Sequence, residues 1–226
     1  GALAGEFPLL SFSALQAQLA PGTAYVFPPA VRPGTTTAVQ LGVIDPTPDL
    51  QWFVHDTRLN LRILGPAGDF HVPPPPYWKG PRGGTNAPPI PREVPAELTI
   101  PADQPEGFVY WQVANANGIS KTARFFVSRG AEILESRSRD LPQRLPAFPV
   151  SVSGRLSRLT EVDRYELTAE RDGPVSISLM ARRLGADFRG LLQVHDESGR
   201  LLADFSDTEG VDGGLTFGAV GGRRYV

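Results

Sequence analysis

The sequence predicts an all-β fold made of two tandem antiparallel β-sandwiches. The 226 residues include 24 Gly and 23 Pro, about a fifth of the chain against an average usage of roughly 12%, so turns should be frequent. Between these turn formers lie short runs that are rich in β-branched and aromatic residues. Several runs alternate apolar and polar residues, which is the period of a strand buried on one face.

Composition and charge exclude several functional classes. Hydrophobic residues make up 41% of the chain and charged residues 20%, a balance that allows a core and is atypical of disordered chains. With 22 basic and 24 acidic residues the net charge is −2, so no overall field attracts nucleic acid, and we expect no nucleic-acid partner. No run approaches the roughly 18 apolar residues of a membrane span. The absence of cysteine excludes disulfides and thiolate chemistry.

Residues 1–22 are expected to form an N-terminal tail with one short helix at 11–20, where apolar residues have helical spacing before Pro21-Gly22. The small residues Ala2-Leu3-Ala4 are typical of the end of a secretory signal. They indicate export to the periplasm, the cell surface or the medium. A fragment boundary at Gly1 is the alternative.

The first sandwich is expected over residues 23–129, because short strand-like runs are separated there by Pro or Gly. These runs lie at 24–27, 37–41, 51–54, 60–64, 97–100, 108–113 and 124–127. A proline-rich insertion is expected at 65–101, since proline lacks the N–H donor of a central strand. Within it, Tyr77 and Trp78 follow four prolines. They are either a stacking platform for a sugar or peptide, or a pair folded back against the strands.

A linker is expected at 130–148, where charge and proline replace apolar residues. A second series of strand-like runs follows over residues 149–226. It comprises 150–152, 164–167, 175–179, 191–194, 200–203 and 215–217. Val175, Ile177 and Leu179 share one face of their run, which is typical of a half-buried antiparallel strand.

The order of signals in the C-terminal third resembles the bacterial pre-peptidase C-terminal (PPC) domain, a jelly-roll-like β-sandwich appended to secreted peptidases and other exported proteins. The resemblance is carried by Val152-Ser153-Gly154-Arg155-Leu156, Val162-Asp163-Arg164-Tyr165-Glu166-Leu167, Gly173-Pro174, Leu184-Gly185-Ala186-Asp187, 194–203 and Asp212-Gly213-Gly214-Leu215-Thr216-Phe217. It implies that the last strand of the second sandwich, at Arg224-Tyr225-Val226, is cut short.

The end of the first region, from Ile100 through Val113-Ala114-Asn115-Ala116-Asn117-Gly118 to Phe126-Val127, resembles the last strands of immunoglobulin-like or TIG-like modules. The pairing of the two modules resembles large exported proteins of planctomycete-type bacteria. This resemblance implies that further domains of the parent protein adjoin the chain.

The sequence offers little catalytic chemistry. It contains no G-x-S-x-G elbow, no H-E-x-x-H pair and no P-loop. His55 and His195 each precede an aspartate, but adjacent strand residues point to opposite faces and do not converge on one substrate. His71 falls in the expected loop. We therefore expect no enzyme within this chain and leave the activity of the parent protein open.

Calcium is the one cofactor for which the sequence offers candidates. The densest acidic stretch runs from Asp196 to Asp212 at expected turns, and loop carboxylates suit calcium. The PPC resemblance adds Glu132 and Glu135, because some family members bind calcium through the segment that leads into the domain. The candidate ligands are Glu132, Glu135, Asp204 and Asp207. The alternative is that these aspartates shape hairpin turns through their own backbone bonds, and we expect no tightly bound cofactor.

The sequence thus favours non-catalytic β-sandwich modules that act as scaffold or binding surface of an exported bacterial protein. An extracellular protein or a polysaccharide would be the partner. Two alternatives remain at this point. The chain is the accessory region of a secreted peptidase or other hydrolase whose catalytic domain lies outside it, or it is a carbohydrate-binding module that uses Tyr77 and Trp78.

Overall fold

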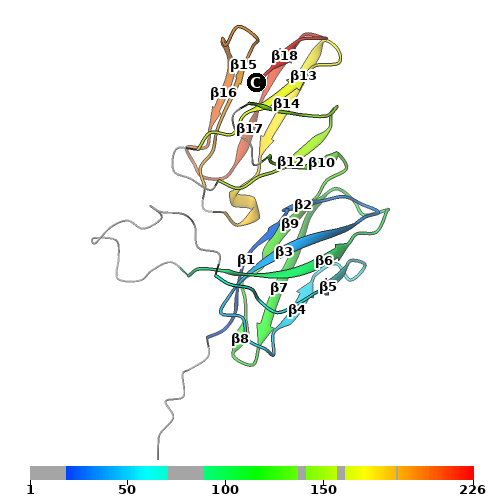
Figure 1. Cartoon of the computed structure of the whole chain (residues 1–226), viewed down its shortest axis with the longest axis vertical. Coiled ribbons are helices and arrows are strands. Elements are labelled where there is room, and N and C mark those ends of the chain that lie inside the picture. The colour runs from blue at the N-terminus through cyan, green and yellow to red at the C-terminus, as the bar shows by residue number, and fades with distance from the viewer. Residues whose placement is uncertain (1–18, 71–88, 137–140, 157–160, 187) are drawn as a thin grey trace, which may run out of the picture.

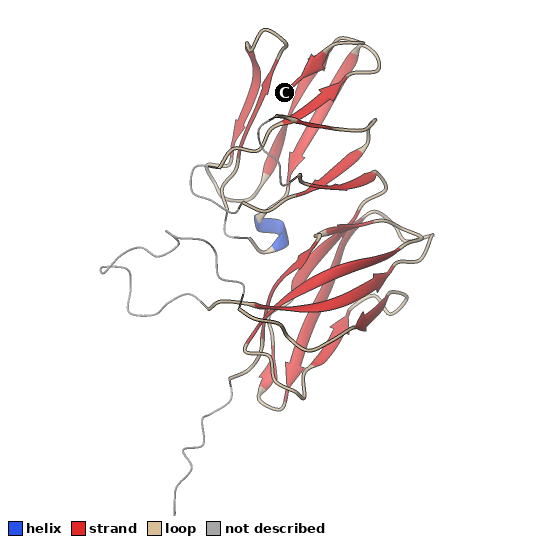
Figure 2. Ribbon diagram, viewed as in Figure 1, coloured by secondary structure: helices blue, strands red, loops and turns tan. Residues whose placement is uncertain are grey.

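A computed structural model describes residues 19–70, 89–136, 141–156, 161–186 and 188–226. The fold is all-β, with several sheets of mainly antiparallel strands, and this confirms the predicted fold class (Figure 2). The single helical turn in the described residues is the 3-10 turn η1 (Arg182–Leu184). The described helices include none long and apolar enough to cross a membrane. The expected helix at 11–20 falls almost wholly outside the described residues, as do His71, Tyr77 and Trp78.

Two facing sheets make up the N-terminal sandwich, the lower body in Figure 1. The four-stranded sheet has the order β1-β3-β6-β5, with bounds Gly22–Phe27, Thr36–Ile44, Arg92–Thr99 and Asn60–Ile63. The other sheet has the order β2-β9-β7-β4, with bounds Ala30–Val31, Ala123–Val127, Gly107–Asn115 and Gln51–Val54. The short strand β8 (Gly118–Ile119) pairs with the end of β7.

The core of this sandwich follows from strict alternation along its central strands. On β7, Val109, Trp111 and Val113 are buried, whereas Tyr110 between them is exposed. Trp111 stacks on Trp52 of the neighbouring strand β4, with ring centroids 6.4 Å apart. β7 carries large residues on both faces, but the face with Trp111 is buried and the face with Tyr110 is more exposed.

Strand β6 occupies part of the segment 65–101 that the sequence marks as a proline-rich insertion. Val94, Ala96 and Leu98 alternate toward the core, and this pattern prevails over the proline between them. Pro95 lies opposite Gln40 of β3, and its carbonyl accepts a hydrogen bond from Leu64 N–H at 2.8 Å. A central strand can therefore contain a proline, because the carbonyl still pairs where the N–H is missing.

The C-terminal half consists of shorter sheets with two or three strands each, drawn at the top of Figure 1. Three antiparallel pairings dominate, namely β14 (Gly173–Leu179) with β17 (Gly213–Ala219), β15 (Leu191–His195) with β16 (Leu201–Ser206), and β13 (Tyr165–Thr168) with β18 (Arg224–Tyr225). A second cluster of buried residues, separate from the first, lies between them and includes Leu167, Val194, Phe217 and Tyr225.

The expected linker at 130–148 contains two strands. β10 (Ala131–Leu134) pairs in parallel with β12 (Val150–Ser153), and β11 (Gln143–Arg144) pairs in parallel with β13. The sequence predicts antiparallel pairing, but these two pairs are parallel. Parallel neighbours need a connection that returns to the same end of the sheet before the second strand begins. The connecting segment is thus partly built into the C-terminal sheets, and the division into two domains stays a prediction.

The last residues are paired on two sides. β18 pairs with β13, and the backbone groups of Val226 exchange two hydrogen bonds with His195 at the end of β15, at 2.8 and 3.0 Å. The phenol of Tyr225 accepts a bond from Val220 N–H at 2.8 Å. Three residues at the end of the chain therefore connect two sheets of the C-terminal half.

Arg155 joins the two halves of the chain. Its guanidinium lies over the ring of Phe27, 3.8 Å from the centroid, and 5.3 Å from that of Tyr25, both on β1. It also forms an ion pair with Glu93 of β6 at 2.8 Å. Burial, together with the hydrogen bond that Tyr25 donates to Glu93, raises the pKa of Tyr25. A carboxylate and two aromatic rings therefore hold this cation at the junction, and Arg183 of η1 lies over Phe108 of β7 at a second point, 5.8 Å from the ring centroid.

Candidate functional site

Three carboxylates gather where the C-terminal half begins. Glu135 directly follows β10, and Glu161 and Asp163 precede β13. One ligand oxygen from each lies within 4.8 Å of the others, and all three residues are partly buried. Gln143 of β11 lies opposite Tyr165 of β13, and its side chain also bonds the backbone on either side of Glu135, so the ends of these segments meet.

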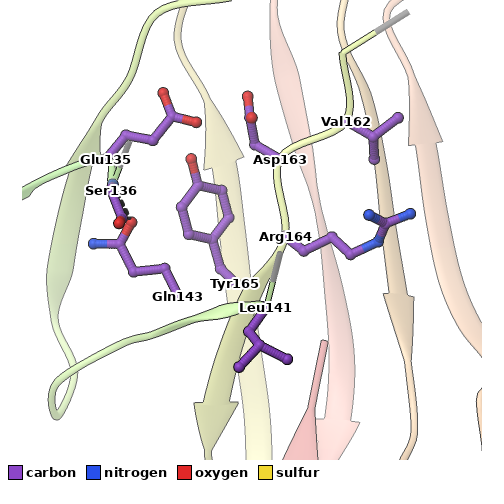
Figure 3. Close-up of a pocket in the computed structure, with 8 residues that line it drawn as sticks. All are labelled: Glu135, Ser136, Leu141, Gln143, Val162, Asp163, Arg164 and Tyr165. Carbon is purple, nitrogen blue, oxygen red and sulfur yellow. Dashed lines mark hydrogen bonds between the residues drawn. The ribbon is translucent and has the colours of Figure 1, made fainter. Parts of the chain in front are cut away.

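The pocket beside this acidic cluster is small. Its volume is about 10 Å³, which holds roughly one water molecule. Figure 3 shows Glu135 and Asp163 on either side of the Tyr165 ring, with the side chain of Gln143 below. Gln143 accepts a hydrogen bond from Ser136 N–H at 2.7 Å and donates one to the Leu134 carbonyl at 2.9 Å. The strand end that carries Glu135 is thereby fixed.

The acidic cluster offers the right kind of ligand for a hard cation, but few ligands. Calcium prefers six to eight oxygen ligands, and the cluster supplies three carboxylates. One oxygen of Glu135 already accepts the backbone N–H of Arg155 at 3.0 Å. Glu135 also has a structural role, because this bond joins the acidic cluster to Arg155 at the junction of the two halves.

Of the four predicted calcium ligands, the structure places only Glu135 in this cluster. Glu132 lies on β10, three residues before Glu135, so it points to the opposite face. There one of its oxygens accepts the Ser153 hydroxyl at 3.0 Å. Burial raises the pKa of Glu132, although the Ser153 bond opposes this effect. Asp204 lies on β16 opposite Gln193.

Asp207 and Asp212 shape one turn between β16 and β17. Asp207 is buried, and its carboxylate accepts the N–H groups of Gly210, Val211 and Asp212 at 2.7 to 3.2 Å. Asp212 has a positive φ of 64° and accepts three N–H groups at the start of η1, each at 2.9 Å. The Asp207 carboxylate therefore holds its own turn, as the alternative interpretation of the acidic stretch states. The Asp212 carboxylate instead joins this turn to η1, about thirty residues earlier in the chain.

Burial disfavours ionisation of Asp212, but the bonds from the backbone N–H groups of Arg183, Arg182 and Ala181 outweigh it and hold the pKa of Asp212 below its ordinary value. The carboxylate stays ionised at neutral pH for the same reason that it is well bound: fixed dipoles replace the lost water.

The two histidine–aspartate pairs lie in different halves of the chain. His55 follows β4, and its Nε2 lies 2.8 Å from Oε1 of Gln112. Asp56 binds the guanidinium of Arg58, and the hydrogen bonds from Arg58 lower the pKa of Asp56 to about 2. His195 ends β15, and Asp196 accepts three hydrogen bonds within its own turn. The side chains of His55, Asp56 and Asp196 are thus engaged by neighbouring groups, and the His195 backbone pairs with Val226.

Glu161 and Asp163 are the site residues that sequence reasoning missed. The signal that could have found them is local, since acids two residues apart on an extended segment point to the same side. Their approach to Glu135 depends on the pairing of distant segments and is not visible in the sequence. Comparison of the chain with models of known protein families gives no match, and comparison with curated proteins gives none either.

Proposed function

We propose that residues 1–226 act as non-catalytic β-sandwich modules, a scaffold or binding surface of an exported bacterial protein. The proposal includes an immunoglobulin-like module followed by a PPC-like one. The alternative places the same modules beside a peptidase or other hydrolase domain outside the chain.

The observation that carries this proposal is the way the acid–base side chains are used. His55 binds Gln112, Asp56 binds Arg58, and Asp207 and Asp212 hold a turn. A general base must instead reach a proton of the substrate or of a nucleophile. Side chains that are already committed to structural bonds on separate sheets support a role in shape and binding rather than in turnover.

Two measurements test the proposal. The purified chain should release no product from casein, from p-nitrophenyl esters or from polysaccharides, whereas a catalytic rate that survives further purification would contradict it. The reading frame upstream of Gly1 should encode an export signal. An upstream sequence that encodes a cytosolic domain, with no export signal and no envelope anchor, would contradict the exported location.

A further inference from the structure

The outer face of the β4–β7–β9 sheet carries an unusual set of side chains. Cross-strand pairing places Phe53 opposite Gln112, His55 beside Tyr110, and Tyr110 opposite Arg124. Phe53 is 43% exposed and Tyr110 42% exposed. Aromatic rings on the solvent side of a sheet need an explanation, because the same strands already bury Trp111 and Phe125 on their inner side.

The charge of this face is one-sided. The described strands of the sheet, β2, β9, β7, β4 and β8, contain no aspartate or glutamate, although the whole chain has a net charge of −2. The guanidinium of Arg124 lies 5.8 Å from the ring centroid of Tyr110 and 5.6 Å from that of Phe108. Among the described residues no carboxylate forms an ion pair with Arg124.

The polar side chains between the rings are fixed in position. The Oε1 atom of Gln112 lies 2.8 Å from His55 Nε2, and the Gln112 amide N–H donates a hydrogen bond to the Ser120 carbonyl at 2.9 Å. Arg124 is held by stacking, which leaves its N–H groups able to bind a carboxylate in the plane of the guanidinium. A ligand therefore meets a surface whose side chains lose little freedom on binding.

We propose that this outer face, the platform formed by Phe53, His55, Tyr110, Gln112 and Arg124, binds an acidic polysaccharide. Sugar rings have apolar C–H faces that stack on Phe53 and Tyr110 and hydroxyl edges that meet Gln112 and His55. A uronate carboxylate pairs with Arg124. The inference rests on the proposed function as a non-catalytic module and names the ligand class and site of that module.

The charge density of the platform favours a glycan over single-stranded nucleic acid. Nucleic acid carries one phosphate per nucleotide, and proteins that bind it combine stacking rings with a groove of several basic residues. Arg124 is the one Lys or Arg on the described strands of this sheet. Arg183 of η1 adds a second cation over Phe108, 5.8 Å from the ring centroid. Two cations among several rings suit a chain whose charges are sparse and whose faces are apolar.

Affinity electrophoresis of the full chain tests the proposal, with polygalacturonate, dextran and oligo-dT as probes in separate gels. We expect retardation by polygalacturonate, weaker retardation by dextran and none by oligo-dT. Tyr110→Ala and Arg124→Gln should each weaken polygalacturonate binding about tenfold, the loss typical of a central contact. Arg124→Lys keeps the charge but not the planar stacking group, so its affinity for polygalacturonate should lie between that of Arg124→Gln and that of the parent chain.

Phe70→Ala is the matched control, because Phe70 is 62% exposed and also lies beneath an arginine, with Arg92 5.7 Å from its centroid, but off the platform. It should bind like the parent chain. The proposal is overturned by absence of retardation, by stronger binding of oligo-dT, or by a loss in Arg124→Gln without one in Tyr110→Ala. Reducing-end release from polygalacturonate, assayed in parallel, would contradict the non-catalytic function and leave the platform intact.

Discussion

The two halves of the chain have similar strand signals but differ in the depth of their cores. Among the residues that the structure describes, the N-terminal core joins 15 buried hydrophobic residues, whereas the C-terminal core joins six. In the N-terminal half, β3 and β6 pair over eight residues inside a four-stranded sheet. In the C-terminal half, β14 and β17 pair over seven residues, but no residue of β14 is fully buried.

Glycine accounts for part of this difference. β17 has the sequence GGLTFGA, in which Gly213 shares the face of the buried Phe217 and Ala219 and adds no side chain to the core, whereas Gly214 and Gly218 lie on the exposed face. A Cβ at Gly214 would collide with the carbonyl of Ile177 on β14, so the close approach of these strands requires glycine. Alternation of apolar and polar residues therefore predicts a strand, but the sheet that packs against it decides how deeply its apolar residues are buried.

The largest expected effect comes from truncating one phenylalanine in each core. Phe125→Ala should lower the free energy of unfolding by about 3–5 kcal/mol, because Phe125 is 1% exposed in a core that cannot collapse around the cavity. Phe217→Ala should cost about 2–3 kcal/mol, since Phe217 is 6% exposed in the smaller core. Urea unfolding measures both, with Phe70→Ala as the exposed control. A larger loss for Phe217→Ala would reverse the comparison.

The next effect is confined to the C-terminal half. Asp212→Ala should destabilise it by about 2–3 kcal/mol, because three N–H groups lose their acceptor. Asp212→Asn should cost less, since asparagine keeps an acceptor oxygen and tolerates a positive φ. Thermal unfolding of both variants measures the difference. Equal losses would show that the charge, rather than the turn geometry, is the main contribution.

The same carboxylate makes this half sensitive to acid. The folded-state pKa of Asp212 lies below its unfolded value, so its contribution is fully present above the unfolded pKa, about 3.9. That contribution is lost as the pH falls through the folded pKa. The parent chain should therefore lose stability below about pH 4 more steeply than Asp212→Asn, as acid titration of the melting temperature would show. Parallel curves would contradict this.

A smaller effect is expected at the junction between the halves. Arg155→Ala removes the guanidinium over Phe27 and the ion pair with Glu93, and should reduce the coupling between the halves by about 1–2 kcal/mol. Arg155→Lys keeps the charge but not the planar group, so it should restore only part of the coupling. Calorimetry should show the unfolding transitions of the halves moving apart in Arg155→Ala. An unchanged profile would mean that other contacts hold the junction.

The smallest effect is expected for calcium. Millimolar calcium or a chelator should leave the melting temperature nearly unchanged, because a ligand stabilises by RT ln(1 + [L]/Kd) and three carboxylates make a weak site. Glu135→Gln is the matched control. A rise of several degrees with calcium that Glu135→Gln abolishes would contradict the expectation. Glu161, Asp163, Glu132, Asp204 and Asp207 would then be mutated next.

The sequence by itself determined the all-β class and the approximate position of most strands. Gly and Pro mark where strands end, and alternation marks which face is buried, as at Val175, Ile177 and Leu179. Both signals are local, so they can be read along the chain. The turn role of Asp207 is local in the same way, because its carboxylate binds N–H groups three to five residues later. The Asp212 carboxylate instead binds N–H groups about thirty residues earlier, which no local pattern shows.

Only the tertiary structure decided the features that depend on segments far apart in the chain. Pro95 lies in a central strand because Val94, Ala96 and Leu98 face a core that distant strands complete. The expected linker residues 131–134 and 143–144 pair with strands about twenty residues later. Glu135, Glu161 and Asp163 meet, and Tyr110 lies beside Arg124, through strand register. The alternating pattern fixes which face of a strand is buried, but which distant strand it pairs with is decided when whole sheets pack together.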